Sequence, residues 1–165
     1  MTHNTQRIES AEINRMLAPD MELVANLWLA LMQEHAAYDG IYFSTFRDNY
    51  DRKIRQLEMT LRDPLEQVWI ARVKDEPVGF CSVHMSYVPS MFNSQFQATL
   101  GDIYVSPEFR SVGIGKRLLD EAMNWAHIRE AHSLALNVHQ NNAEAIRFYT
   151  THGFEEKFKV MMKAI

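Results

Sequence analysis

Two glycines, Gly113 and Gly115, lie where a strand-like segment gives way to a helical one. The segment before them, 103–105, is β-branched and aromatic and favours a strand, which Pro107 ends because proline has no N–H for the ladder. After Gly115, apolar residues recur at spacings of three and four, which indicates a helix. The first backbone N–H groups of a helix lack partners within it, and glycine lets an anion approach them closely. The stretch is therefore a candidate phosphate site, and a plain turn between strand and helix is the alternative.

The glycine spacing does not match two common nucleotide-binding patterns. The sequence contains neither Gly-x-Gly-x-x-Gly nor Gly-x-x-x-x-Gly-Lys-Ser/Thr, so neither a dinucleotide fold nor a P-loop is supported. The histidines are scattered without a Cys/His cluster, and no metal site is inferred. The single cysteine, Cys81, lies in an apolar strand pattern, which favours a buried small residue over a nucleophile.

Composition narrows the class of protein. The 165 residues suit one domain, 1–165, with 47% hydrophobic and 23% charged residues. A net charge of −4 argues against a general nucleic-acid binder. The N-terminus lacks the apolar stretch of a signal peptide, and no run approaches the roughly 18 apolar residues of a membrane span. We expect a soluble cytoplasmic protein with neither nucleic acid nor membrane as partner.

Periodicity predicts the elements that position the glycine loop. We expect strands over 8–17, 68–73, 78–88, 95–105, 134–139 and 154–163. We expect helices over 21–37, from a cap at Ser44 or Thr45 to Leu61, over 113–127, and over 143–152 with Asn141 or Asn142 as cap and Gly153 as terminator.

The order of these elements predicts an α/β (α+β) fold. Strands 95–105 and 134–139 are connected through a helix, so they should run parallel with a right-handed crossover, whereas the strands before them form an antiparallel meander. The central sheet is therefore mixed and mostly antiparallel, with helices for both faces. Met161 and Met162 on the last strand are expected in the core, with an interface as the alternative.

Two separated segments resemble one family. The first resembles the Arg/Gln-x-x-Gly-x-Gly/Ala pyrophosphate loop of the GNAT superfamily of acetyl-CoA-dependent N-acetyltransferases, and reads Arg110-Ser111-Val112-Gly113-Ile114-Gly115. The second is similar to the family's Asn-x-x-Ala-x-x-x-Tyr-x-x-x-Gly-Phe segment and spans Asn142 to Phe154. Both occur in order with one helix and one strand between them, and together they are far more specific than either alone.

The resemblance implies the place of the cosubstrate acetyl-CoA. In this family two parallel central strands splay apart, and the pantetheine arm pairs with the backbone groups left open between them, while the pyrophosphate sits on the glycine loop. The cofactor-binding residues implied are Ile103, Tyr104, Val105, Arg110, Ser111, Val112, Gly113, Ile114, Gly115, Lys116, Asn142 and Tyr149.

The resemblance also implies direct acetyl transfer to a primary amine, with Tyr149 as the acid that protonates the leaving thiolate. The alternatives are a core-edge role for Tyr149 and a capping role alone for Asn142. Many relatives have an acidic pair where this chain has Gly101 and Asp102, so the usual base is missing. Asp102, His139 and an ordered water are the remaining candidates for the base.

The acceptor is left open by the sequence. Acidic and aromatic residues of the first half favour a small cationic amine, and a solvated helical face is the alternative for each; they include Glu34, Tyr38, Asp39, Tyr42, Asp48 and Asp51. The segments that border the acceptor pocket of relatives contain some of these residues and others; they include Glu34, His35, Tyr38, Tyr42, His84 and Tyr87. A protein N-terminal or lysine acetyltransferase is the first alternative, and a non-catalytic acyl-CoA sensor is the second. A homodimer is possible, since relatives often form one.

Overall fold

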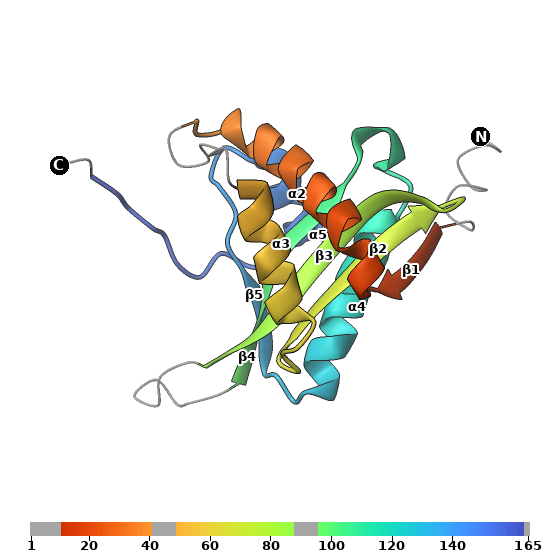
Figure 1. Cartoon of the computed structure of the whole chain (residues 1–165). Coiled ribbons are helices and arrows are strands. Elements are labelled where there is room, and N and C mark those ends of the chain that lie inside the picture. Colours follow the sequence, from red (N-terminus) through yellow and green to blue (C-terminus); the bar gives the residue numbers. More distant parts are fainter. Residues whose placement is uncertain (1–10, 41–48, 88–95, 164–165) are drawn as a thin grey trace.

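The computed structural model describes residues 11–40, 49–87 and 96–163 and shows a five-stranded sheet in the order β1-β2-β3-β4-β5 (Figure 1). The strands pair antiparallel except β4 and β5, which are parallel, so the expected mixed sheet is confirmed. The predicted caps Ser44 and Thr45, the loop 89–94 and the residues 8–10 lie outside the described part. The strands are β1 (Ala11–Arg15), β2 (Glu66–Val73), β3 (Glu76–Tyr87), β4 (Phe96–Val105) and β5 (Ser133–Leu136).

Helices cover both faces of the sheet, as expected from the sequence (Figure 1). On one face, α2 (Met21–Ala36) and α3 (Asn49–Thr60) enclose a core that includes Leu27, Leu57 and Phe80. On the other face, α4 (Ile114–Ile128) packs with Leu118 and Trp125 against the strands, and α5 (Ala143–Thr151) lies beside it. Short 3₁₀ turns occur at 18–20 and 107–109. None of the helices in the described ranges is long and apolar enough to cross a membrane.

The two parallel strands, β4 and β5, stop pairing half-way along β4. They pair from Gln97 with Ser133 to Leu100 with Leu136, and β4 then continues to Val105 without β5 beside it. The predicted strand over 134–139 is therefore too long, because it loses its neighbour at Leu136. This separation opens one edge of β4 at the end where the glycine loop follows.

A β-bulge lies where the separation begins. Cys81 of β3 faces Ile103 and Val83 faces Leu100, so two residues of β4 oppose the single Ser82. The Ser82 hydroxyl accepts the N–H of Asp102 at 2.9 Å, and a Cβ on Gly101 would lie 2.8 Å from that oxygen. Gly101 thus makes room for the hydroxyl that satisfies the bulge, which gives a structural reason for a glycine at this position.

The prediction of a last strand over 154–163 is wrong. These residues form no helix or strand, and every residue from 155 to 163 is exposed, including Met161 and Met162 (88% and 73%). A core position for the two methionines is wrong as well. The alternating pattern is typical of a strand, but a strand requires a paired neighbour, and none of the described strands extends alongside this segment.

Candidate active site

The open edge of β4 presents backbone groups to the gap between β4 and β5. Ser106 donates its N–H to Val78 O at 2.8 Å, so the antiparallel alternation turns Tyr104 toward β3 and turns Ile103 and Val105 toward the gap. Arg110 Nε donates to Val105 O at 2.8 Å and uses one of these groups. The N–H groups of Ile103 and Val105 and the carbonyl of Ile103 face the gap, where an extended amide-bearing ligand can pair with them.

The glycine loop has the backbone form of an anion site. Ser111 and Gly113 have positive φ values of 60° and 86°, and α4 starts directly after Gly113. The N–H of Arg117 donates to Gly113 O at 3.1 Å, so the N–H groups of residues 113–116 precede the first helical hydrogen bond. Backbone amides that converge in such a turn, together with the positive end of the helix dipole, favour a bound phosphate.

The first side chain of the loop is directed inward. Both Glu34 carboxylate oxygens accept from Arg110 Nη2 at 2.7 Å, and the guanidinium lies 5.6 Å from the centre of the Tyr104 ring. The pKa of Arg110 is raised: burial works against the charge, and the hydrogen bond and charge of Glu34 outweigh it. Arg110 therefore ties the loop to α2 through Nη2 and to the end of β4 through Nε.

The two sequence motifs meet in space. A Cβ on Gly115 would lie 3.7 Å from two atoms of the Phe148 ring and 3.9 Å from Val105 Cγ2. The start of α4, the end of β4 and the middle of α5 are thus in contact, although they are far apart in the sequence. Tyr149, the neighbour of Phe148, is brought to the same junction and packs against the core behind the sheet.

Tyr149 combines a fixed ring with an available hydroxyl. Its ring lies 5.3 Å from Phe148 and 5.5 Å from Phe154, both in edge-to-face geometry. The described residues provide no hydrogen-bond partner for the hydroxyl. Burial, followed by the charge of Asp102, raises the pKa of Tyr149 well above its ordinary value of 10.0. The phenol therefore remains protonated at neutral pH and can donate a proton.

Asn142 caps α5, as one of the two sequence alternatives stated. Its side-chain oxygen accepts the N–H of Ala145 at 3.0 Å, which leaves the amide nitrogen for a ligand. Gly153 has a φ of 86° after the last turn of α5, and the expected glycine terminator is confirmed. Contact of Asn142 with the cosubstrate stays a prediction.

Asp102, a candidate base, belongs to an ion pair beneath α3. Lys53 Nζ lies 3.2 Å from Asp102 Oδ2 and 5.1 Å from the centre of the Trp28 ring. The lysine side chain is only 4% exposed and the aspartate 21%. Sequence reasoning did not single out Lys53, although a signal existed: the lysine lies three residues after Tyr50 and four before Leu57, on the apolar stripe of the helix.

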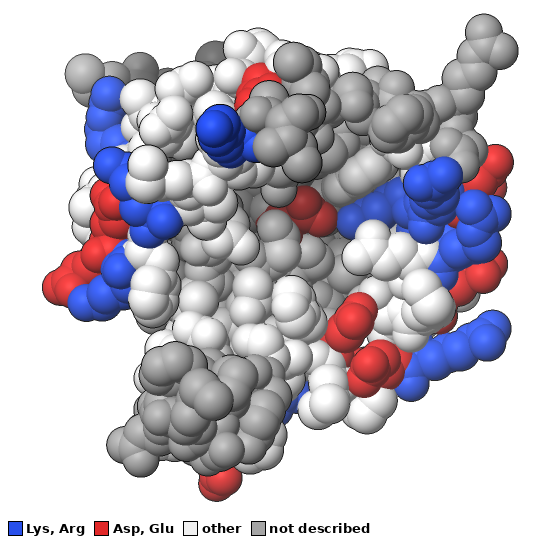
Figure 2. Space-filling view, turned by 90° about the vertical axis from the view of Figure 1, so that its left-hand side faces the viewer, with Lys and Arg blue, Asp and Glu red and all other residues white. Residues whose placement is uncertain are grey.

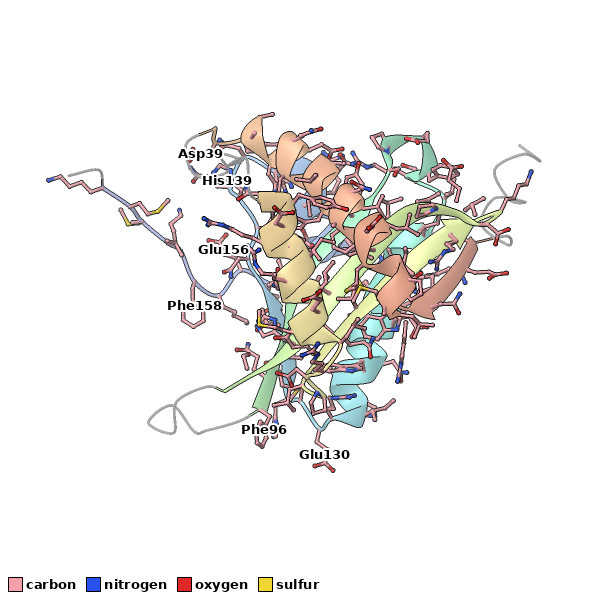
Figure 3. The ribbon with its side chains drawn as sticks, viewed as in Figure 1. Asp39, Phe96, Glu130, His139, Glu156 and Phe158 are labelled. Carbon is pink, nitrogen blue, oxygen red and sulfur yellow. The ribbon has the colours of Figure 1, made fainter. Side chains whose placement is uncertain are left out.

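His139, the other candidate base, lies just beyond β5 rather than on it. Its ring stacks on Tyr38 of the turn after α2, with centroids 6.1 Å apart, and its Nδ1 accepts the N–H of Asn141 at 3.2 Å. Figure 3 shows His139 at this end of α2. His35 lies 6.0 Å from the Tyr38 ring, and its pKa is lowered, first by burial, while Asp102 and Glu34 counteract and His139 adds to the effect. The C-terminal end of α2 therefore brings a second imidazole to the site.

A cavity of about 250 Å³, lined by polar and apolar residues, adjoins the bulge on the α3 side. Asp102 and Glu66 contribute carboxylates to its wall, Lys53 an ammonium and His84 an imidazole. Glu66 accepts the hydroxyl of Thr60 at 2.6 Å. Figure 2 views the molecule from the left-hand side of Figure 1, and an acidic side chain lies recessed in this surface with basic side chains beside it.

Comparison with known proteins bears on these features. The sequence model of the acetyltransferase (GNAT) family matches residues 28–154, which include both motifs and every strand except β1. The chain belongs to this family. The enzyme class and the acetyl-CoA cosubstrate implied by the two motifs are those of the GNAT proteins, and the mixed sheet with its separated parallel strands is their fold.

The relatives differ in what their names state. An uncharacterized N-acetyltransferase of Methanocaldococcus jannaschii is 29% identical over 124 residues, 71% of this chain and 54% of the relative. The peptidyl-lysine N-acetyltransferase YjaB of Salmonella typhimurium is 30% identical over 103 residues, 61% and 59% of the two chains. The chain thus spans a little over half the length of these curated relatives. The aminoglycoside N-acetyltransferase AAC(6')-Iy, solved with CoA, has a TM-score of 0.74 at 20% identity and covers 94% of either chain.

Proposed function

We propose that this GNAT protein transfers the acetyl group of acetyl-CoA to a primary amine. The observation that carries the proposal is the junction of Gly115, Val105 and Phe148, which joins an anion-binding loop, an open strand edge and a tyrosine hydroxyl. Each of these three parts has a counterpart in acetyl-CoA: a pyrophosphate, an amide-bearing pantetheine arm and a thioester. A site for a phosphate alone would need only the loop.

The cosubstrate is placed by its chemistry. The pyrophosphate lies on the backbone N–H groups of residues 111–116, where the φ values of Ser111 and Gly113 turn the amides inward. The pantetheine amides pair with Ile103 and Val105 at the open edge of β4. The thioester then reaches the region of Tyr149 and the bulge at Gly101. The ion pair between Arg110 and Glu34 keeps the loop in register with α2.

The reaction is a displacement at the thioester carbonyl. The neutral amine attacks the carbonyl carbon, the C–S bond breaks, and the departing thiolate takes the proton of the Tyr149 hydroxyl. The raised pKa keeps this proton on the phenol until the thiolate forms. A backbone N–H at the gap, that of Ile103 or Val105, stabilises the oxyanion.

The proton lost by the amine passes to a base on the α2 and α3 side. Asp102 and His139 are the candidates from the sequence, and the structure adds His35, whose lowered pKa keeps its imidazole neutral and able to accept a proton. Lys53 holds the Asp102 carboxylate at 3.2 Å, so a water between Asp102 and the amine suits this carboxylate better than direct contact. These assignments remain proposals.

For the acceptor we favour a small cationic molecule. The cavity beside Gly101 and Asp102 has two carboxylates in its wall, from Asp102 and Glu66, and they outnumber the single ammonium of Lys53. A peptide lysine is the second candidate, because a relative at 30% identity is named a peptidyl-lysine N-acetyltransferase. A pocket that closes around the amine would favour the first candidate, and an open groove would favour the second.

A thiol-release assay with acetyl-CoA tests the proposal and separates the candidates. The panel contains a polyamine, an aminoglycoside, amino acid derivatives and a lysine peptide. We expect thiol release above the rate of acetyl-CoA alone with a small cationic amine, and mass spectrometry to show one added acetyl group. Binding of acetyl-CoA without release on any amine would instead indicate a sensor, and release with the peptide alone would reassign the acceptor.

A further inference from the structure

A second cavity, of about 440 Å³, lies at the end of the sheet where β2 begins. Its wall contains three arginines from three different parts of the fold: Arg15 ends β1, Arg62 follows α3 and Arg129 follows α4. Figure 1 shows that α3 and α4 both end near the start of β2. Segments far apart in the sequence thus bring three guanidinium groups to one cavity.

None of these arginines forms an ion pair within the part of the chain that the structure describes. The side chains of Arg15 and Arg62 have no hydrogen-bond partner there either. Like charges gathered around one cavity repel each other, and a bound anion replaces this repulsion with attraction. The three arginines therefore have the charge that an anionic ligand needs, and no carboxylate of the described residues competes for it within ion-pair distance.

Arg129 is already held in a fixed orientation. Its Cζ lies 3.9 Å from the centre of the Trp125 ring, and its Nη2 donates to Pro64 O at 3.2 Å. The other N–H groups of this guanidinium have no partner among residues 11–40, 49–87 and 96–163. Stacking fixes the plane of the group, and its open edge has the fork geometry that matches a carboxylate or a phosphate.

The acidic residues nearby are engaged in other contacts. Glu66, in the cavity wall, accepts the hydroxyl of Thr60 at 2.6 Å. Asp63, also in the wall, accepts the N–H of Leu65 at 2.8 Å. These two bonds hold the turn between α3 and β2, which forms one side of the cavity. Figure 3 shows the side chain of Glu130 projecting outward from this end of the molecule. Three positive and two negative groups leave the wall with a net charge of +1.

Apolar side chains form another part of the wall. Leu17 and Leu61 keep 64% and 39% of their surface exposed, while Met16 and Val68 belong to the core beneath. Binding sites for small molecules commonly combine apolar surface with a few polar groups that fix the orientation of the ligand. Exposed leucines beside three arginines suit a ligand with an anionic head and an apolar body.

The cavity is separate from the acetyl-CoA site. Arg129 directly follows the last residue of α4, whereas the glycine loop directly precedes the first. The 15 residues of α4, at 1.5 Å each, place the two about 22 Å apart. The cavity beside Asp102 shares the wall residues 60 and 66–68 with this one, but none of the three arginines lines it.

We propose that Arg15, Arg62 and Arg129 bind a small organic anion, with its phosphate or carboxylate head on the guanidinium groups and its apolar body against Leu17 and Leu61. The head receives charge-assisted hydrogen bonds from side chains of three separate segments, which fixes its position. The inference does not depend on the proposed acetyl transfer, since none of these five residues takes part in it.

Calorimetric titration of the whole protein with phenyl phosphate and with phenylacetate is the first test. CoA is present at saturation, so that the glycine loop is occupied. We expect saturable binding of at least one probe with a dissociation constant below about 1 mM, and none of benzyl alcohol, which lacks the charge. The tighter probe assigns the head as phosphate or carboxylate. Absence of saturable binding by both probes overturns the proposal, and inorganic phosphate that binds as tightly as phenyl phosphate overturns the apolar contact.

The double variant Arg15→Gln with Arg62→Gln tests the named residues. Both side chains are exposed, so the fold should be retained, and the dissociation constant should rise by more than about fivefold. The matched control, Arg55→Gln with Lys74→Gln, removes two exposed positive charges outside the cavity and should leave the constant within about twofold. An unchanged constant in the first variant, or an equal rise in the control, overturns the assignment.

Amide chemical shifts locate the bound probe. The shifts that change on titration should belong to residues 15–17, 60–68 and 129, which form or adjoin the cavity wall. Changes confined to residues 111–116 would place the probe on the glycine loop and overturn the proposal.

Discussion

Tyr149→Phe removes one oxygen atom and leaves the rest of the junction in place. The ring contacts with Phe148 and Phe154, at 5.3 and 5.5 Å, do not involve the hydroxyl, and the described residues offer it no hydrogen bond. The free energy of unfolding should therefore change by less than about 1 kcal/mol, and the melting temperature by no more than roughly 4 °C. Affinity for acetyl-CoA should also stay close to the native value.

Turnover should respond quite differently. A positioned general acid contributes about 100-fold to 10,000-fold in rate, or ~2.7–5.4 kcal/mol of barrier, and Tyr149→Phe should lose most of this in kcat. The raised pKa gives a second test. The Tyr149 phenol stays protonated up to and beyond pH 10.0, the ordinary pKa of tyrosine, so ionisation of the phenol causes no loss of activity below that pH. The rise of activity with pH must come from the amine or the base, and should keep its midpoint in the variant.

The assay is thiol release at saturating acetyl-CoA with the best amine of the panel, together with calorimetric titration of CoA. Tyr50→Phe on α3 is the matched control, since it removes the same atom from a partly buried tyrosine away from the junction. A Tyr149→Phe variant that binds CoA normally and turns over at the native rate would refute the role of Tyr149 as the acid.

Three further substitutions follow from the site. Gly113→Glu and Gly113→Gln both place a side chain at φ 86°, so the two variants should lose similar stability. The carboxylate of Gly113→Glu should weaken CoA binding by a further 0.7–3 kcal/mol, roughly 3-fold to 100-fold, for a charge about 6 Å from the phosphate. Equal affinities of the two variants by calorimetry would argue against a phosphate there. Asp102→Asn leaves the nearly buried ammonium of Lys53 without its counter-charge and should lower the free energy of unfolding, measured in urea, by about 2–4 kcal/mol. Adding Lys53→Met in the double variant should restore part of this loss, whereas additive losses would contradict the pairing. His35 binds protons less well in the folded than in the unfolded protein, so its contribution to stability is present above pH 6.5 and is lost as the pH falls from there through its lower folded pKa. His35→Gln should flatten this part of the curve of stability against pH. An unchanged slope of that curve would show that His35 is not its source.

The sequence predicted helices α2 to α5 and strands β1 to β5, but the predicted last strand over 154–163 is wrong. Apolar residues at helical spacing predicted α2, α3, α4 and α5, because such residues face a core. The loop was predicted from its two glycines, and Gly113 has the positive φ that favours this residue type. The end of β5 and the segment 154–163 were misjudged, because pairing depends on whether a neighbouring strand is present, which local pattern does not contain.

The rest of the site depends on contacts between distant segments. Lys53 and Asp102 are far apart in the sequence, and so are Glu34 and Arg110; each pair is joined only by the packing of α2 and α3 on the sheet. The glycine at 101 was visible as a departure from the family pattern, but its reason was not. The Ser82 hydroxyl that occupies the space of a side chain emerged only with the bulge.

A crystal structure with CoA tests the central claim most directly. The proposal predicts the pyrophosphate on the backbone N–H groups of residues 111–116, the pantetheine amides paired with Ile103 and Val105 along the open edge of β4, and the sulfur within hydrogen-bond reach of the Tyr149 hydroxyl. CoA bound elsewhere, or in the gap with its sulfur remote from Tyr149, would contradict the account.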